Sequence, residues 1–224
     1  MKNKSIVLFS GGLDSSVNLY SAVQSTKVVL ALTFNYGQRA FKKELETTQY
    51  FCERLNIQHQ VVDLPWLQAI TNTSLVRRDN QVPTGSAVQI DDLNRSFETA
   101  RAVWVPNRNG IFLNIAAAFA EALCADEIVV GFNSEEAQTF PDNSAAYLES
   151  LNQCFKYSTA TKVKVKCYTL NMNKTEIAQL GQSLKLPFAK IWPCYFAKEV
   201  ICGECESCQR FNRALLQAGV KVEV

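Results

Sequence analysis

The sequence predicts an α/β protein: a doubly wound parallel sheet with a small metal-binding segment at its C-terminal end. Short runs rich in Val, Ile, Leu or Phe alternate with helical stretches, which is typical of βαβ units with helices on both faces of a sheet. Four cysteines also fall within fifteen residues near the C-terminus. We therefore expect an α/β domain over residues 1–189, with a cysteine-rich segment and final helix packed on it over 190–224.

The first half of the chain supplies most of the expected sheet. Buried strands are predicted at residues 5–9, 28–34, 58–63 and 127–131. Helices are predicted between them at residues 14–25, 38–56 and 111–125. In parallel sheets of this kind ligands bind outside the carboxyl ends of the strands, so the segment after the first strand is the first candidate site.

The remaining segments are assigned one by one. Residues 64–106 form a long connection in which the stretch TARAVWVP is predicted to be extended. A helix is expected from Ser144, and the alternating stretch KVKVKCYTL predicts a further strand. Asn173 with Glu176 three residues on is typical of a capping box that opens a helix. The last helix is expected from Glu206 to Ala218, ended by Gly219.

Composition excludes several classes of protein. Hydrophobic residues make up 47% and charged residues 20% of the 224 residues, which is ordinary for a globular protein. A formal net charge of +2 gives no broad positive field, so no nucleic-acid partner is expected. The apolar stretch at the N-terminus is too short for a signal peptide, and no window is long enough to span a membrane. We therefore expect a cytoplasmic protein.

The eight cysteines fall into two groups. Four are scattered through apolar or mixed segments and are expected to be buried free thiols: Cys52, Cys124, Cys154 and Cys167. The others form the pattern C-x7-C-x2-C-x2-C and are the candidate metal ligands: Cys194, Cys202, Cys205 and Cys208. Four thiolates at this spacing can close a tetrahedral shell around a structural zinc ion. An iron–sulfur cluster is the alternative, because C-x2-C-x2-C also occurs in ferredoxin-like sequences.

The stretch FSGGLDSS at residues 9–16 is the strongest candidate site. Gly11 and Gly12 allow a tight turn whose N–H groups approach an anion, and the start of the next helix adds positive partial charge. The hydroxyls of Ser10, Ser15 and Ser16 offer further donors. The sequence has no Walker motif, so an ordinary P-loop kinase or GTPase is excluded. The alternative interpretation is a strand-to-helix turn in which Asp14 and Ser15 only cap the helix.

Three further groups of polar residues follow expected strands or begin helices. Arg108 has a planar guanidinium fork that is suited to a carboxylate or phosphate. Residues 35–38 follow the second strand, where they form either a ligand contact or a simple turn. Glu135, Glu136 and Asp142 are either magnesium ligands or solvated acids, with Asp142 also a helix cap.

Two basic residues complete these candidates. Lys174 is either a phosphate contact or an ordinary exposed lysine. The lone histidine, His59, is expected to be structural, which argues against a Ser-His-Asp or Cys-His hydrolase.

These motifs together resemble a known family. Ser-Gly-Gly-Leu-Asp-Ser after a first strand is similar to the pyrophosphate-binding loop of the N-type ATP pyrophosphatases, the PP-loop superfamily with its adenine nucleotide alpha hydrolase-like fold. Five further segments resemble the 7-cyano-7-deazaguanine synthase (QueC) family, in order along the chain: NYGQR at 35–39, VPNRNGIFLNIAAAFAEAL at 105–123, GFNSEEAQTFPDNS at 131–144, NKTEI at 173–177 and WPCYFAKEVICGECESC at 192–208.

The resemblance implies an enzyme of queuosine biosynthesis. Such an enzyme uses ATP, with Mg²⁺, to convert 7-carboxy-7-deazaguanine and ammonia to the nitrile through adenylated intermediates, and it releases AMP and pyrophosphate. It also implies a structural Zn²⁺ on the four clustered cysteines. The chain has no convincing glutaminase domain, so free ammonium or a partner would supply the nitrogen. A homodimer is expected.

The resemblance also implies roles for residues of this chain. ATP would bind at the loop Phe9, Ser10, Gly11, Gly12, Leu13, Asp14, Ser15 and Ser16. The catalytic residues would be Asp14, Ser15 and Arg108. The deazapurine substrate would contact Tyr36, Gln38, Arg108, Asn109 and Asp142, and Trp192 and Tyr195 would stand at the pocket where it stacks.

Two features depart from the family pattern. Phe211 stands where the family has an arginine three residues after the last cysteine, with Arg210 and Arg213 on either side, and residues 139–144 are a variant of the family's segment. Two other functions remain as alternatives. One is a transfer-RNA thiolating enzyme of the same superfamily, and the other is a zinc-knuckle protein that binds nucleic acid without catalysis.

Overall fold

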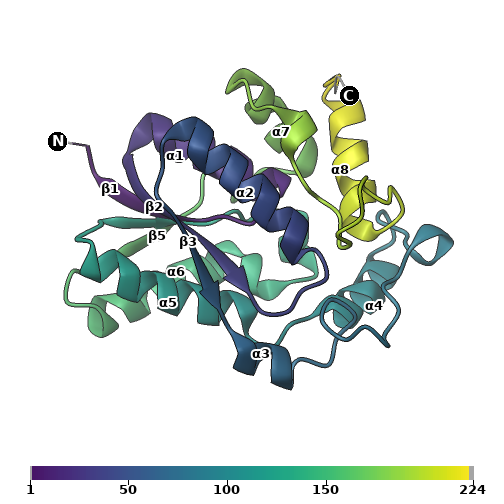
Figure 1. The fold of residues 1–224 in the computed structure, drawn as a ribbon, viewed down its shortest axis with the longest axis horizontal. Coiled ribbons are helices and arrows are strands. Elements are labelled where there is room, and N and C mark those ends of the chain that lie inside the picture. The colour runs from purple at the N-terminus through teal and green to yellow at the C-terminus, as the bar shows by residue number, and fades with distance from the viewer. Residues whose placement is uncertain (1, 222–224) are drawn as a thin grey trace.

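The computed structural model describes residues 2–221 and contains one five-stranded sheet. Its strands are β1 (Lys4–Leu8), β2 (Lys27–Asn35), β3 (His59–Asp63), β4 (Glu127–Val129) and β5 (Lys164–Lys166). All neighbouring strands pair in parallel, in the order β3-β2-β1-β4-β5 (Figure 1). The chain leaves β1 toward β2 on one side and returns to β4 on the other, which confirms the doubly wound α/β fold.

Helices cover both faces of this sheet. They are α1 (Leu13–Ser25), α2 (Phe41–Leu55), α3 (Pro65–Ile70), α4 (Leu93–Val103), α5 (Arg108–Ala122), α6 (Ala145–Ser158), α7 (Lys174–Ser183) and α8 (Glu206–Gln217). Short 3-10 turns lie at Gly85–Ala87, Glu136–Gln138, Pro141–Asn143 and Phe188–Lys190. In Figure 1, α1 and α2 lie on one side of the sheet, and α5 and α6 on the other.

Alternation along β1 explains the two layers. Ile6 and Leu8 point into the hydrophobic cluster that holds Leu113 of α5, whereas Val7 joins Val17 of α1 in the other cluster. Successive side chains of a strand face opposite sides, so a fully apolar strand needs cover on both faces. The runs at 5–9, 28–34 and 127–131 correspond to the centre of the sheet. The run at 58–63 was also predicted to be a buried strand, but it forms the edge strand β3, in which no residue is buried.

Most predicted elements lie within a few residues of the observed ones, and one is wrong. The stretch TARAVWVP was predicted to be extended, but residues 99–103 belong to α4. The side chain of Asp92 accepts hydrogen bonds from the amides of Asn94 and Arg95 and begins this helix. Ala100 and Val103 are buried, so tertiary packing outweighs the local propensity of the β-branched residues.

The prediction for the scattered cysteines is half wrong. Cys52 is buried and Cys167 is half-buried, but Cys124 and Cys154 are exposed. Cys154 lies on α6, which buries Leu151 and Phe155 but leaves Cys154 exposed. Cys124 follows the end of α5 in the left-handed conformation, with φ of 50°. Apolar neighbours in the sequence therefore did not indicate that Cys124 or Cys154 is buried.

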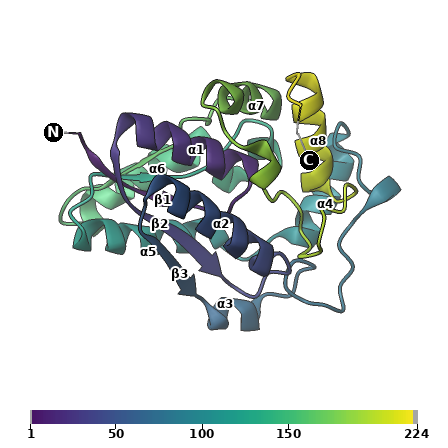
Figure 2. The same cartoon turned by 45° about the horizontal axis from the view of Figure 1, so that its top comes forward.

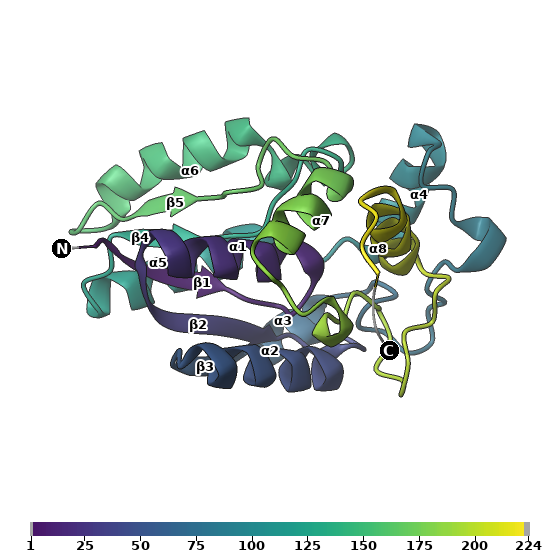
Figure 3. The same ribbon diagram turned by 90° about the horizontal axis from the view of Figure 1, so that it is seen from above.

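The C-terminal helix shares the main core. Phe211, Ala214 and Leu215 of α8 belong to the same hydrophobic cluster as α1 and α7. On another side α8 lies beside α4 (Figures 2 and 3), where the hydroxyl of Thr99 donates to a carboxylate oxygen of Glu206 at 3.0 Å. The division into a domain over 1–189 and a segment over 190–224 stays a prediction. Residues 2–221 contain no helix both long and apolar enough to cross a membrane.

Candidate active site

A cavity of about 270 Å³ opens at the carboxyl ends of β1, β2 and β4. It lies at the point where the order of the strands reverses, the expected place for a ligand in such a sheet. Its walls come from segments far apart in the sequence. They include Phe9, Ser10, Gly12, Leu13, Asp14, Ser15, Tyr36, Gln38, Glu44, Arg108, Asn109, Glu136, Asn143, Lys174, Trp192, Tyr195, Glu206, Ser207 and Arg210.

The loop after β1 presents backbone N–H groups to this cavity. Gly11 has φ of 79°, a conformation that favours glycine, and Gly12 precedes α1 without any side-chain cap. Within residues 2–221, the amides of Gly11, Gly12, Leu13 and Asp14 have no hydrogen-bond acceptor. The helix-cap alternative is therefore not realised, and an uncapped helix start beside a cavity is suited to an anion.

The hydroxyls of the loop differ in accessibility. Ser10 and Ser15 line the cavity, and their Oγ atoms lie 3.1 Å apart. Ser16 is fully buried, and its Oγ has no partner within the described residues. The hydroxyl of Ser16, predicted to contact phosphate, therefore does not reach the cavity. Gly11 does not line the cavity either.

Close backbone contacts hold the loop in place. A Cβ atom on Gly131, which follows β4, would lie 2.7 Å from the amide nitrogen of Ser15, so only glycine fits there. A Cβ atom on Gly11 would lie 2.7 Å from a methyl carbon of Thr47 on α2. The carbonyl oxygen of Gly11 accepts the amide of Trp192 at 3.0 Å. The cysteine-rich segment is therefore hydrogen-bonded directly to the loop.

Lys174 is buried between two carboxylates of the cavity wall. Its Nζ donates to Asp14 Oδ2 at 2.5 Å and pairs with Glu136 Oε1 at 2.6 Å. Burial raises the pKa of Asp14 to about 6, against the attraction of Lys174. Burial alone would lower the pKa of Lys174, but the two carboxylates raise it. The alternative of an exposed lysine is wrong, and Lys174 lies at the cavity.

Glu135 belongs to a separate ionic network with α8. It accepts the backbone N–H of Lys174 at 2.8 Å, and it pairs with Arg210 at 3.2 Å and with Arg213. Arg210 is 7% exposed and also pairs with Glu206 at 2.9 Å. Glu135 is thus neutralised by arginines, which makes it a poor candidate for a magnesium ligand. The two arginines beside Phe211 tie α8 to the segment after β4.

The predicted substrate residues come together only in part. Tyr36, Gln38, Arg108 and Asn109 line the cavity, and Arg108 Nη1 lies 3.4 Å from the Tyr36 hydroxyl. Asp142 lies outside the lining set, although its carbonyl accepts Asn109 Nδ2 at 3.4 Å. Burial raises the pKa of Asp142, against the attraction of Arg108. Its contact with substrate stays a prediction.

Gln38 is engaged with the protein itself. Its Nε2 donates to the carbonyl of Phe34 at 2.8 Å and to Glu44 Oε2 at 2.7 Å, while its Oε1 accepts the amide of Tyr36 at 3.0 Å. Both amide hydrogens of Gln38 are therefore used to fix the turn after β2 and the Glu44 carboxylate. Its role as a substrate contact stays a prediction.

Two carboxylates of the cavity were missed in the sequence. Glu44 lies on α2 and lines the cavity wall, and burial raises its pKa to about 7. Glu206 begins α8 between two clustered cysteines. The Cys205–Cys208 spacing indicated a fixed turn around Glu206 and could have pointed to that residue. Glu44 lies in the ordinary helical stretch FKKELETT, which gives no such signal. His59 has the structural role predicted, with its Nε2 2.8 Å from Thr33 Oγ1.

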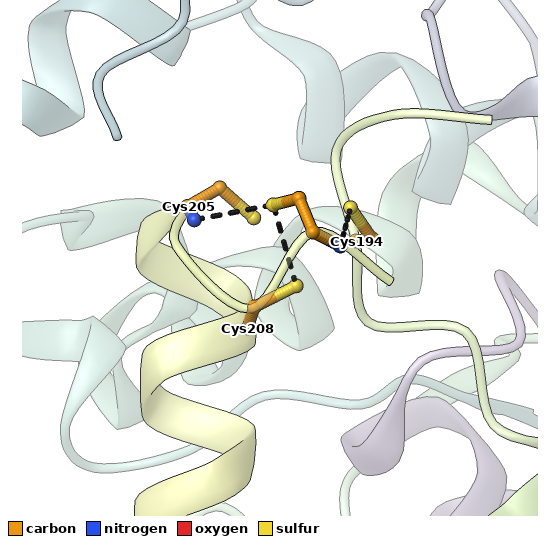
Figure 4. A group of neighbouring side chains, drawn as sticks. Cys194, Cys205 and Cys208 are labelled. Atoms are coloured by element: carbon orange, nitrogen blue, oxygen red, sulfur yellow. Dashed lines mark hydrogen bonds between the residues drawn. The ribbon is translucent and has the colours of Figure 1, made fainter. Parts of the chain in front are cut away.

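The four clustered cysteines converge into one group. Figure 4 shows Cys205 and Cys208 at the start of α8, facing Cys194 on the preceding segment. Together with Cys202, their sulfur atoms all lie within 4.8 Å of one another, and Cys202 Sγ lies 3.9 Å from Cys208 Sγ. The amides of Phe196 and Cys202 donate to the Cys194 sulfur, both at 3.4 Å. These sulfurs form a site suited to a metal ion.

Comparison with known proteins covers almost the whole chain. Residues 4–219 match the family model described as "Queuosine biosynthesis protein QueC". The sequence is 55% identical over 224 residues to the 7-cyano-7-deazaguanine synthase of Bdellovibrio bacteriovorus, covering 99% of this chain and 97% of that protein. It is 47% identical to the enzyme of the same name from Pelotomaculum thermopropionicum, covering 98% and 100% of the two chains.

A solved structure shows the same fold at low identity. A 4-thiouridine synthetase in complex with RNA and bound ATP aligns with a TM-score of 0.50 and 19% identity, over 97% of this chain and 50% of that chain. The likeness concerns the fold alone. By its match along residues 4–219 and its identity to these relatives, the chain belongs to the QueC family of queuosine biosynthesis proteins.

Proposed function

We propose that the chain is a 7-cyano-7-deazaguanine synthase that converts 7-carboxy-7-deazaguanine, ammonia and ATP to the nitrile, AMP and pyrophosphate. The observation that carries this proposal is the uncapped start of α1, where the amides of Gly11 to Asp14 have no acceptor within residues 2–221 and Gly12 to Asp14 line the cavity. Family membership supports the substrate, because the curated relatives carry the name of this enzyme.

The first half of the reaction makes a carboxylate oxygen into a leaving group. The loop amides bind the two phosphates that leave as pyrophosphate, and they meet the negative charge that grows on these phosphates. Mg²⁺ bound with ATP would offset phosphate charge and make the α-phosphorus easier to attack. Arg108 directs the attacking carboxylate, since its guanidinium lines the cavity and its fork suits two oxygens. Asp14 and Ser15 are the two residues of this loop that we propose to be catalytic.

The second half replaces AMP by ammonia and repeats the activation on the amide. Displacement of AMP gives the amide, and adenylation of the amide oxygen allows loss of a second AMP to leave the nitrile. Tyr36, Asn109, Trp192 and Tyr195 form the wall against which the flat deazapurine rests. Aromatic faces suit such a ring, and the Asn109 amide offers a polar contact.

We assign a structural Zn²⁺ to Cys194, Cys202, Cys205 and Cys208. A tetrahedron with Zn–S bonds of about 2.3 Å has edges of about 3.8 Å, close to the 3.9 Å between the Cys202 and Cys208 sulfurs. Four thiolates leave no open position, so the ion would serve structure. It would hold Trp192 and Glu206 at the cavity from both sides of the cluster.

One assay tests the proposed reaction. The purified protein is incubated with 7-carboxy-7-deazaguanine, ammonium and Mg-ATP, while mass spectrometry follows the deazapurine and chromatography follows the nucleotide. The proposal predicts the nitrile together with AMP and pyrophosphate. Formation of ADP and phosphate would overturn the adenylation mechanism, and an unchanged deazapurine would overturn the substrate.

Location and assembly belong to the same proposal. We place the enzyme in the cytoplasm, because clustered cysteines that bind a metal ion as thiolates suit a reducing compartment. We also propose a homodimer that acts on small molecules without binding nucleic acid. Light scattering of the purified protein and a band-shift assay with transfer RNA would test these two points.

A further inference from the structure

Four carboxylates line the cavity in the described part of the chain, and their surroundings differ. Asp14 and Glu136 share Lys174, and Glu206 pairs with Arg210. Glu44 is the fourth. Among residues 2–221, no lysine or arginine nitrogen lies within 4.0 Å of its carboxylate. The cavity therefore contains one carboxylate without a cationic partner.

The surroundings of Glu44 orient this carboxylate toward the cavity. Oε2 accepts the Gln38 amide at 2.7 Å, and Gln38 is itself fixed by the backbone of Phe34 and Tyr36. Oε1 has no partner within the described residues. Arg108 of α5 attracts the carboxylate from beyond contact distance, and Tyr36 is the other titratable group that faces it. On α2 itself, Lys43 pairs instead with Glu46.

The proposed reaction requires a group of this kind. Ammonium carries a positive charge, so a carboxylate without a partner binds it, but only the neutral amine has a lone pair for attack. We propose that Glu44 binds ammonium in the cavity and accepts its proton, so that ammonia attacks the adenylated carboxyl carbon. This inference rests on the proposed function. The raised pKa of Glu44, about 7, suits a proton acceptor near neutral pH.

The step balances without any further reagent. One N–H bond of ammonium breaks and an O–H bond forms on Glu44. The freed lone pair forms the C–N bond, while the C–O bond to AMP breaks and its electron pair leaves with the phosphate. The nitrogen then loses one more proton to water, which gives the amide and AMP. Glu44 returns its proton to solvent before the next cycle.

The Glu44→Gln variant tests this role, because glutamine keeps the shape and can still accept the Gln38 hydrogen bond. Glu46→Gln is the matched control on the same helix, where the glutamate is exposed and paired with Lys43. Each variant is assayed with ammonium and, separately, with hydroxylamine. Hydroxylamine is unprotonated at neutral pH, so it traps the acyl adenylate as a hydroxamate without needing a proton acceptor.

We expect Glu44→Gln to lower kcat/KM for ammonium by about 100-fold at pH 7, with hydroxamate formation within about twofold of wild type. The ammonium rate of this variant should keep rising with pH as free ammonia increases, whereas wild type levels off above pH 7. Glu44→Asp should recover part of the loss, and Glu46→Gln should match wild type.

Two results would overturn the assignment: equal loss of hydroxamate and ammonium activity in Glu44→Gln, which would place Glu44 in adenylation or substrate binding, or unchanged use of ammonium. Absence of hydroxamate with the wild-type protein is a different result. It would show that no acyl adenylate forms and would overturn the proposed function itself, together with the inference that rests on it.

Discussion

At the scale of single residues, buried charges set the properties of the cavity. Lys174 is 7% exposed and stands between Asp14 and Glu136, so each ion compensates the burial of the others. In the described part of the chain, Glu44 has no such cationic partner. We expect the ion pairs of Lys174 to stabilise the fold at neutral pH. We expect ionisation of Glu44 to destabilise it. Both expectations can be tested by stability measurements.

Lys174→Met should destabilise the fold by about 3 kcal/mol at pH 8, because two buried carboxylates lose their common partner. Lys174 lowers the pKa of Glu136 against the effect of burial, so its contribution is present above the ordinary pKa and is lost on acidification. The difference from wild type should therefore shrink toward pH 4. Urea denaturation at several pH values measures it, with the exposed Lys156→Met as control. An equal loss at every pH would contradict the ion-pair explanation.

Glu44→Gln should stabilise the fold at pH 8, by at most about 3 kcal/mol. The folded pKa of Glu44 is raised from 4.5 to about 7, so ionisation of Glu44 opposes folding above pH 7. Below pH 4.5 the carboxyl is protonated in both states, and the advantage of glutamine disappears. Thermal unfolding across this range is the measurement. A variant less stable than wild type at pH 8 would show that the carboxylate is stabilised by its surroundings.

At the scale of elements, helix starts determine which groups reach the cavity. The capping box of α7 was predicted from sequence and is confirmed: Asn173 accepts the Glu176 amide, and Glu176 accepts the Asn173 amide. By contrast, α4 was missed, because the packing of Ser96 and Thr99 against α8 involves residues more than a hundred positions away. Local patterns indicate caps, whereas such packing is visible only in three dimensions.

Asn173→Ala should lower the free energy of unfolding by about 1 kcal/mol and should also raise KM for ATP, because α7 begins with Lys174 at the cavity. Asp92→Ala is the matched control, since Asp92 caps α4 and lies outside the lining set. It should cost similar stability while leaving KM for ATP unchanged. Parallel changes of KM in the two variants would mean that stability alone governs the effect.

At the scale of the whole molecule, the candidate active site is assembled from both ends of the chain. The parallel sheet, the loop after β1 and the cysteine group could be predicted, since each has a local pattern. The pair of Asp14 with Lys174 joins positions 160 residues apart, and the position of Glu44 depends on how α2 packs. No local pattern encodes such contacts, which explains why these parts of the site were missed or left open.

The cysteine group should therefore control activity through the segments that it holds at the cavity. Cys205→Ser is expected to lose the bound metal, lower the melting temperature and abolish nitrile formation, because Trp192 contacts the loop and Glu206 lines the cavity. Metal analysis, thermal unfolding and the product assay check this in parallel. The exposed Cys154→Ser is the control and should behave as wild type. Full activity of a metal-free Cys205→Ser protein would contradict the structural role.

The proposed reaction depends on backbone amides at the start of α1 that bind the phosphates of ATP. The most direct measurement is an NMR spectrum of protein labelled with ¹⁵N at its nine glycines, recorded during titration with pyrophosphate. The amide signals of Gly11 and Gly12 should shift together and saturate, while those of Gly203 and Gly219 stay fixed. Unchanged Gly11 and Gly12 signals at saturating pyrophosphate would show that these amides do not bind the phosphates.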